Sequence, residues 1–401
     1  MRVRLVAFLS LAAAFVVAPL ACGSTEGTAD DAGASPPQGT VAPPLPSTSA
    51  SVPTKDAASA PDAVANDASA DGSIDAPTDG PKVPPIVAPA NTWTYVPIPG
   101  MVCGNGSPTG IAVNPASDPT APVLFLLMGG GACWNDVTCL GGAASNLDTQ
   151  IDEAAIRADI ARFPILFDRA LADNAFKTHS YVFVPYCTGD LHAGNAQKTY
   201  RLLTKSQTIE HRGARNLDAL LPHVAATFPR APKVVIGGGS AGGFGTMLGY
   251  HQFRAYFPAQ RLDILNDSGT PIEPSGSIWG DMQSAWNMRL PASCVGCTQD
   301  PRAILPYLAA QMGPQARFGL LTYTEDRTIR SFTGVLLPQQ FSAAVSELKT
   351  RLAPRQKMFV VGGDDHVIIK QNPLPSAQGV SAVTWLQRFA SDDPAWDTVG
   401  P

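Results

Sequence analysis

The sequence is short of charged residues, and beyond its first residues it has no long hydrophobic run. Charged residues make up 15% of the chain, whereas soluble domains typically have about 25%. The net charge of −5 excludes a strongly basic nucleic-acid-binding protein, so we expect no nucleic-acid partner. No later apolar run reaches the roughly 18 residues that a membrane-spanning helix needs.

Aromatic residues are missing between Phe15 and Trp93. Residues 23–92 are rich in Ala, Pro, Ser and Asp, and they hold nine acids but only two lysines. Such a segment buries too little apolar surface to offset its loss of conformational entropy. We therefore predict a disordered linker over 23–92. It would be followed by one electrically neutral folded domain over 93–401, large enough to bury a full core.

Residues 1–22 have the pattern of an export signal. Arg2 and Arg4 precede the apolar run 5–17, which is short for a membrane span. The run ends in Ala-Pro-Leu-Ala-Cys and resembles a bacterial lipobox, in which Cys22 would be lipidated, although Pro19 stands where an aliphatic residue is usual. We expect an exported protein in the cell envelope that contacts the membrane through this lipid anchor only. Plain secretion is the alternative.

Six cysteines remain once Cys22 is set aside, an even number in a chain expected to be exported. An oxidising compartment favours three disulfides. We predict the pairs Cys133–Cys139, Cys294–Cys297 and Cys103–Cys187. The Cys294-Val-Gly-Cys297 segment could also be half of a zinc site or a redox pair, but no second Cys or His pair at zinc-finger spacing accompanies it. We therefore expect no metal.

From residue 121 onward, apolar runs typical of buried strands alternate with segments of helical periodicity. This alternation predicts an α/β fold, a mostly parallel sheet with helices on both faces. In such sheets the reactive groups lie beyond the carboxyl ends of the strands. The expected strands are 123–127, 181–184, 233–236, 262–265, 318–323 and 357–361, and the expected helices include 154–170, 216–226 and 242–256.

A nucleophile motif follows one of these strands. Gly-Gly-Ser-Ala-Gly at 238–242 fits the pattern G-x-S-x-G, in which the serine occupies a sharp turn between a strand and a helix. Ser240 is thus the predicted catalytic nucleophile. Two histidines follow it, His251 and His366. His251 falls inside the next helix, whereas His366 follows the strand 357–361, so we predict His366 as the base.

Several acids could orient that histidine. Asp326 follows the strand 318–323 and is the favoured candidate, because the acid of this fold comes after the nucleophile and usually from that later strand end. Asp267, after the strand 262–265, is the second candidate, and Glu325 is a lesser one. Asp364 and Asp365 adjoin the histidine in sequence, where a side-on contact with its ring is difficult.

A glycine-rich loop could stabilise the negative charge that develops on an ester oxygen. Residues 128–133 read Met-Gly-Gly-Gly-Ala-Cys and follow the strand 123–127. We predict that the backbone N–H groups of Gly130, Gly131 and Ala241 form the oxyanion hole. The loop is no phosphate-binding P-loop, because no Lys-Ser or Lys-Thr follows it.

Together these motifs resemble the pectin acetylesterase/Notum family. The resemblance implies an α/β-hydrolase fold and hydrolysis of carboxylic esters without a metal or cofactor. It supports Ser240, Asp326 and His366 as the triad and makes Asp267 a structural residue. Met128 and Ala132 depart from the family, which often has an acid and a tryptophan there. The segments that carry the resemblance are 103–110, 126–133 with Cys139, 185–190, 211–215, 239–243 and 266–269.

The sequence therefore predicts a monomeric serine esterase that removes acyl groups from a small molecule or a polysaccharide. Ser240 would form an acyl-enzyme, and water would then hydrolyse it with help from His366. Two alternatives remain open. One is a non-catalytic carbohydrate-binding lipoprotein on a hydrolase scaffold, and the other is a serine peptidase.

Overall fold

The computed structural model describes residues 83–401. The expected export signal at 1–22, with Cys22, and the expected linker up to residue 82 lie outside the described residues. Residues 83–92, which the sequence analysis assigned to the linker, already contact the folded domain. Ile86 and Ala88 pack against its core, and the Ile86 N–H donates to Thr227 Oγ1 at 2.8 Å.

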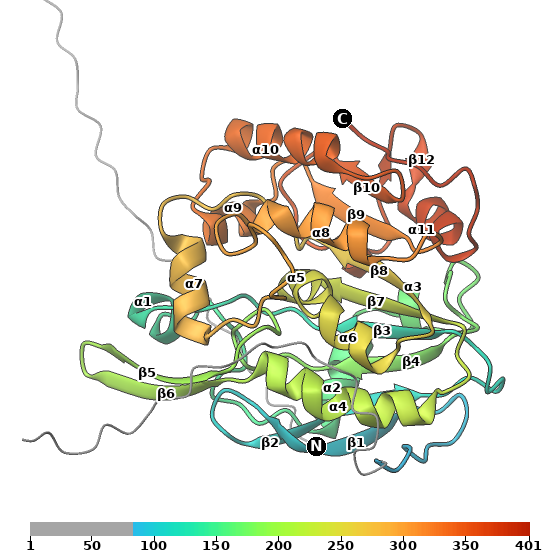
Figure 1. Ribbon diagram of the computed structural model, residues 1–401, viewed down its shortest axis with the longest axis horizontal. Coiled ribbons are helices and arrows are strands. Elements are labelled where there is room, and N and C mark those ends of the chain that lie inside the picture. Colours follow the sequence, from blue (N-terminus) through green and yellow to red (C-terminus); the bar gives the residue numbers. More distant parts are fainter. Residues whose placement is uncertain (1–82) are drawn as a thin grey trace, which may run out of the picture. The chain divides into compact units, whose positions relative to one another are not determined.

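An eight-stranded sheet forms the centre of the domain (Figure 1). The pairs β1–β2 and β2–β4 are antiparallel, and the other five pairs of neighbours are parallel. This confirms the mostly parallel sheet expected from the sequence. In spatial order the strands are β1 (Thr94–Val102), β2 (Pro108–Asn114), β4 (Ser180–Val184), β3 (Val123–Leu127), β7 (Lys233–Gly239), β8 (Arg261–Asp267), β9 (Phe318–Tyr323) and β10 (Gln356–Val361).

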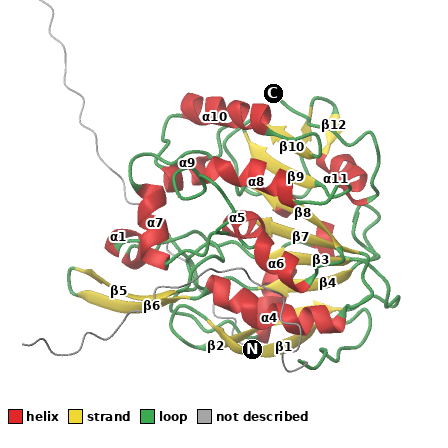
Figure 2. Ribbon diagram, in the orientation of Figure 1, coloured by secondary structure: helices red, strands yellow, loops and turns green. Residues whose placement is uncertain are grey.

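Helices cover both faces of this sheet (Figure 2). Successive residues of β3 point to opposite faces, so Leu124 joins one buried cluster with α2, α7 and α11, and Phe125 joins another with α4, α6, α8 and α10. The helices are α1 (Asp136–Leu140), α2 (Glu153–Ile160), α3 (Pro164–Phe167), α4 (Gly213–Thr227), α5 (Ala241–Leu248), α6 (Tyr250–Tyr256), α7 (Ile278–Trp286), α8 (Ile304–Gln311), α9 (Arg327–Thr333), α10 (Pro338–Arg351) and α11 (Ala382–Ala390).

Smaller elements connect the main ones. A separate antiparallel hairpin, β5 (Ala196–Leu202) and β6 (Lys205–His211), extends from the domain beside α1 and α7 (Figure 1). The remaining elements are the 3₁₀ turns η1 (Pro301–Ala303) and η2 (Ile368–Lys370), and the short strands β11 (Ser376–Ala377) and β12 (Val380–Ser381). No helix within residues 83–401 has the length and apolar character needed to cross a membrane.

Two of the expected helices are divided. The helix predicted over 154–170 becomes α2 and α3, separated by an irregular turn, because Pro164 starts a new helix at a position that needs no N–H donor. The helix predicted over 242–256 is interrupted at Gly249, which ends α5 and precedes α6. The sequence analysis also missed β1, β2 and the β5–β6 hairpin.

Three disulfides lie in the described domain. They join Cys103 to Cys187, Cys133 to Cys139, and Cys294 to Cys297, the pairs expected from the sequence. The first links the loop after β1 to the loop after β4, across 84 residues of chain. The other two close short loops of 6 and 3 residues. The Cys294–Cys297 bond also leaves that segment no free thiolate for a metal.

The tight packing of β9 on α11 leads to a stability prediction. A Cβ added at Gly319 would lie 2.7 Å from the buried Trp385 ring, which is too close. We expect Gly319→Ala to lower the free energy of unfolding by about 1–3 kcal/mol, as overpacking of a core does. Gly280→Ala is the control, because that exposed position in α7 has nothing within 4 Å. Denaturant unfolding should give Gly280→Ala a free energy of unfolding equal to or higher than that of the wild type. An equal decrease of this free energy in both variants would contradict the packing argument.

Candidate active site

Ser240 occupies a strained turn between β7 and α5. It is the N-cap of α5, and its φ of 57° and ψ of −122° are unusual for a residue with a side chain. Its side chain is mostly buried, with 8% of the residue exposed. A serine in such a turn projects its hydroxyl beyond the carboxyl edge of the sheet, as a nucleophile elbow requires.

The two glycines of the motif allow the chain to make this turn. A Cβ on Gly238 would collide with the carbonyl oxygen of Gly242, and a Cβ on Gly242 would collide with the carbonyl oxygen of Leu127 in β3. Both collisions involve backbone, which cannot move aside. The spacing G-x-S-x-G therefore follows from how closely β3, β7 and α5 approach one another.

His366 and Asp326 meet through the pairing of β9 and β10. These strands are parallel neighbours, so the turns after them lie side by side. His366 Nδ1 lies 2.8 Å from Asp326 Oδ2, and Asp326 is completely buried. The other oxygen of Asp326 accepts the Ile329 N–H at 2.9 Å and so caps α9. The carboxylate is thus held from two sides with one oxygen directed at the imidazole.

The other acids considered for this role have other contacts. Asp365 accepts the backbone N–H of His366 at 2.8 Å instead of contacting its ring, and Asp364 is half exposed near Arg327. Glu325 contributes its backbone N–H to the carbonyl of Gly363.

Asp267, the second candidate, lies close by but does not bond to the imidazole. It is completely buried at the end of β8 and accepts the backbone N–H groups of Ile368 and Ile369. Burial raises the pKa of Asp267 to about 6, although those hydrogen bonds oppose the rise. His251 lies in α6, where burial lowers its pKa to about 4.

Ser240 and His366 line the same open groove. Among the described residues no hydrogen bond joins them, and the buried Nε2 of His366 has no hydrogen-bond partner there. This nitrogen is the atom left for a reacting hydroxyl, because Nδ1 is engaged by Asp326. Hydrogen bonds between a nucleophile and its base are often long before a substrate binds.

The glycine-rich loop after β3 lies against the elbow. A Cβ added at Gly129 would lie 2.9 Å from Ser240 Cβ and 3.3 Å from the backbone nitrogen of Ala241. Within residues 83–401, no acceptor takes the backbone N–H groups of Gly130, Gly131 or Ala241. The structure thus brings the three expected oxyanion donors to the side of Ser240.

Three buried side chains hold the carbonyl groups of this loop. His192 Nε2 donates to the Met128 carbonyl at 2.8 Å, Tyr186 Oη donates to that of Gly131 at 3.0 Å, and Trp286 Nε1 donates to that of Cys133 at 2.6 Å. The Cys133–Cys139 disulfide closes the segment that follows. Tyr186 lay in one of the quoted motifs, but no sequence signal singled out His192 or Trp286.

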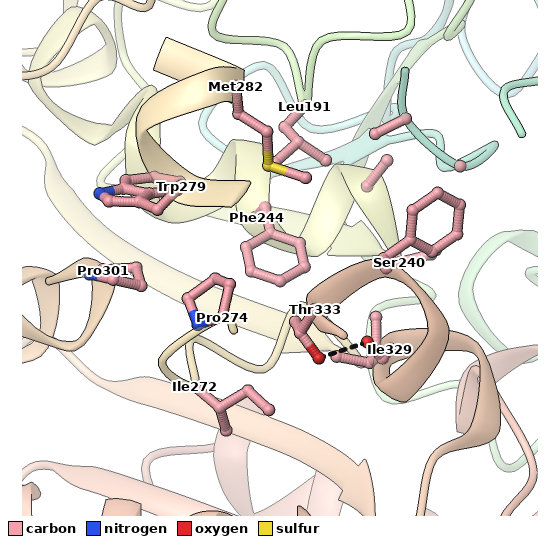
Figure 3. A pocket seen from close by; sticks show the side chains of 14 residues that line it. Leu191, Ser240, Phe244, Ile272, Pro274, Trp279, Met282, Pro301, Ile329 and Thr333 are labelled. Carbon is pink, nitrogen blue, oxygen red and sulfur yellow. Dashed lines mark hydrogen bonds between the residues drawn. The ribbon is translucent and has the colours of Figure 1, made fainter. Parts of the chain in front are cut away.

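An apolar cavity opens from Ser240 on one side (Figure 3). Figure 3 shows Phe244 near its centre, with Met282 and Trp279 of α7 around it. Its remaining walls come from the glycine-rich loop after β3, the segments after β4 and β8, the start of α5, η1 and α9. The residues are Gly131, Ala132, Leu191, Ala241, Ile272, Pro274, Pro301, Ile329, Phe332 and Thr333. Such a lining suits a hydrocarbon group.

A polar groove opens on the other side of Ser240. Lys370 of η2 lines it, as do Arg162 and Asp159, which form an ion pair of 3.0 Å. Asn146 and Thr149 add uncharged polar groups. Ser240 therefore lies between an apolar cavity and a polar groove.

One buried cluster in the described domain has the chemistry of metal ligands. Cys133, Cys139 and His211 bring their ligand atoms within 4.8 Å of one another. The two sulfurs are joined in a disulfide, and the nitrogens of His211 contact Tyr200 Oη and the Thr188 carbonyl, each at 2.8 Å. All these atoms are already engaged, so the cluster offers no free ligand in this state.

Comparison with known proteins agrees with this architecture. The family model for pectinacetylesterase matches residues 92–284. The match includes Ser240 and Asp267 but ends before Asp326 and His366. A curated relative, the palmitoleoyl-protein carboxylesterase Notum of Schmidtea mediterranea, is 25% identical over 193 residues, which are 47% of this chain. The match spans only 33% of that relative's length.

Two crystal forms of the Wnt deacylase Notum from Drosophila share the fold. They have TM-scores of 0.55 and 0.54 at 16% and 15% sequence identity. The matches cover 75% and 77% of this chain and 93% and 95% of those structures. At this identity they establish a Notum-like fold alone. The family model and the curated relative thus show that residues 92–284 are similar to pectinacetylesterases and to a Notum carboxylesterase.

Proposed function

We propose that this chain is a serine carboxylic-ester hydrolase with Ser240 as nucleophile, His366 as base and Asp326 as the acid that orients it. The observation that carries the proposal is the strained turn of Ser240 at the groove that His366 also lines, with the imidazole bonded to a buried carboxylate. The family match and the Notum relative support ester hydrolysis as the chemistry.

In the proposed reaction, Ser240 Oγ attacks the ester carbonyl and its proton passes to His366 Nε2. The oxyanion would be stabilised by the N–H groups of Gly130, Gly131 and Ala241. His366 then gives the proton to the departing alcohol, and an acyl-enzyme remains on Ser240. Water, activated by the same histidine, releases the acid. Asp326 holds the imidazole in the tautomer with its proton on Nδ1.

The two sides of the site point to the substrate class. The cavity lined by Phe244, Trp279 and Met282 would take an apolar acyl group larger than acetyl. The groove lined by Arg162 and Lys370 would take the polar alcohol, such as an acylated saccharide. The relative's name, a palmitoleoyl-protein carboxylesterase, agrees with an acyl group of this kind.

The triad assignment is tested by three substitutions. We expect Ser240→Ala and His366→Ala each to lower the turnover of a short-chain aryl ester by about 10⁴ or more, because the members act as a unit. Asp326→Asn should lower it by roughly 10²–10⁴, because the wrong tautomer is then favoured. Initial rates and melting temperatures should be measured together, so that loss of folding is recognised.

Asp365→Asn is the matched control, because Asp365 adjoins His366 but contacts its backbone N–H. We expect it to keep most of the activity. A panel of peptides serves as the second control, because a serine peptidase would cleave them. A folded Ser240→Ala variant with wild-type activity would end the hydrolase proposal and favour the non-catalytic carbohydrate-binding protein.

The acyl cavity gives a second test. Ala132 is buried in its wall, with 2% exposed. We expect Ala132→Leu to shorten the preferred acyl chain, because the larger side chain fills space that the acyl group would use. For p-nitrophenyl esters from acetate to octanoate, kcat/KM should fall by about 10-fold or more for the long esters relative to acetate.

Ala155→Leu is the control, because Ala155 lines the polar groove instead of the cavity. Its effect should be the same for all chain lengths. If Ala132→Leu also changed every ester by the same factor, the acyl group would not lie in this cavity.

We also propose that the protein is exported and anchored to a membrane through lipid on Cys22. The three disulfides are consistent with export. Mass spectrometry should find Cys22 as the modified first residue, and the protein should enter the detergent phase on partitioning. Cys22→Ser should move it to the aqueous phase. An unmodified Cys22 in a protein recovered from the medium would favour plain secretion.

A further inference from the structure

Three strained residues meet at the carboxyl end of β8. Ser240, Ser268 and Val367 have φ values of 57°, 61° and 64°. Side chains disfavour this backbone region, and a β-branched valine disfavours it most. Such conformations persist only where the surroundings fix them, and they gather at functional sites. Something must therefore hold the turns at Ser240 and Val367 in place.

The Asp267–Ser268 pair contacts both of these turns. On one side, the Asp267 carbonyl oxygen accepts the Ser240 N–H at 2.7 Å. On the other side, Ser268 Oγ accepts the Val367 N–H at 3.1 Å and donates to Asp267 Oδ1 at 3.0 Å. The main chain of this pair thus holds the nucleophile turn, and its side chains hold the segment after His366.

Most of the hydrogen bonds to the segment after His366 come from the carboxylate of Asp267. Its Oδ1 accepts the Ile368 N–H at 3.1 Å, and its Oδ2 accepts the Ile369 N–H at 2.7 Å. Asp326 bonds to the ring of His366 but not to the backbone that carries it. The position of that backbone relative to Ser240 therefore depends on Asp267.

We propose that Asp267 is a positioning residue, whose carboxylate holds the backbone after His366 and so keeps the imidazole in reach of Ser240. It touches neither the imidazole nor a reacting atom. The inference rests on the proposed esterase function, and it gives Asp267 a role distinct from that of Asp326.

The charge of Asp267 is needed for this role. The ionised carboxylate accepts three hydrogen bonds, and protonation would turn one acceptor oxygen toward donating. Burial raises the pKa of Asp267 to about 6 from its ordinary value of 3.8. The groups around it that titrate or carry charge are His366 and Lys370 after β10, and Tyr323 and Asp326 at the end of β9.

Ionisation of Asp267 has opposite effects on the stability of the fold and on the proposed activity. Because the folded-state pKa of Asp267 is raised, its protonated form contributes stability that is full below about pH 3.8 and lost as the pH rises through about 6. At neutral pH the buried charge therefore lowers stability, while it holds the His366 segment. A purely structural residue would be expected to stabilise the fold under these conditions.

The test compares Asp267→Asn with Asp263→Asn. Asp263 is a buried carboxylate nearer the amino end of the same strand, where it accepts the Arg317 N–H and forms an ion pair with Arg261. We expect Asp267→Asn to lower kcat/KM for p-nitrophenyl acetate by about 30-fold or more at pH 8, with a melting temperature no lower than that of Asp263→Asn. Asp263→Asn should keep kcat/KM within about twofold, since additivity holds for distant sites.

The pH profile provides a readout that a structural role would not move. On the acidic side of the plot of log kcat/KM against pH, the wild type should show one more inactivating protonation than Asp267→Asn. Its limiting slope there should therefore be steeper by one. Ser268→Ala, which keeps the charge but loses the Val367 contact, should lower kcat/KM and retain the steeper slope. This variant also covers the case in which Asp267→Asn fails to fold.

A measurement without substrate separates this inference from the proposed function. The proton between His366 Nδ1 and Asp326, followed by NMR, should exchange with water faster in Asp267→Asn than in the wild type or Asp263→Asn. If the wild type hydrolysed no ester and the exchange were still faster in Asp267→Asn, the esterase proposal would end and the positioning role would stand. Unchanged exchange, with kcat/KM and slope equal to wild type, would overturn the positioning role.

Discussion

The close approach of three backbone segments at Ser240 is the constraint on which the rest of the site depends. The end of β3, the turn after β7 and the first turn of α5 come so near that Gly238 and Gly242 have no room for a side chain. The chain makes the turn only by placing Ser240 in a conformation that side chains disfavour. The neighbouring elements supply the contacts that keep it there.

The support for this turn comes mainly from parallel strand pairing. Because β7, β8, β9 and β10 are neighbours in the sheet, the segments that follow them emerge at one edge. Asp267 ends β8, whereas Asp326 and His366 follow β9 and β10, and their hydrogen bonds connect the four turns. The register of the sheet thus brings Ser240, His366 and two buried carboxylates together.

The glycine-rich loop after β3 depends on a different set of contacts. Its carbonyl groups are taken by His192, Tyr186 and Trp286, which come from the segment after β4 and from α7. With those carbonyls engaged, the loop stays against the elbow with its N–H groups open. The same α7 also supplies Trp279 and Met282 to the apolar cavity, so one helix supports both the loop and the cavity wall.

The sequence by itself determined the strands of the sheet core, the serine at the turn after β7 and the two disulfides that close short loops. These features are local, because an apolar run, a glycine pattern and two nearby cysteines each carry their own signal. The break at Gly249 and the division at Pro164 were also local, but the surrounding helical periodicity obscured them. The strand β1 at the edge of the sheet is interrupted by Pro97 and Gly100, and its neighbour β2 has only the short apolar run 111–113, so neither was recognised from the sequence.

Only the tertiary structure shows that Asp326, and not Asp267, bonds to the imidazole of His366. Both acids follow a strand and both are buried, so sequence order could favour one without excluding the other. The choice depends on which carboxylate oxygen reaches the imidazole, and that follows from strand neighbours 40 residues apart in the chain. The sequence also gave no sign that His192 and Trp286 would bond to the glycine-rich loop, or which residues would line the cavity and the groove beside Ser240. These contacts join residues that only folding brings together.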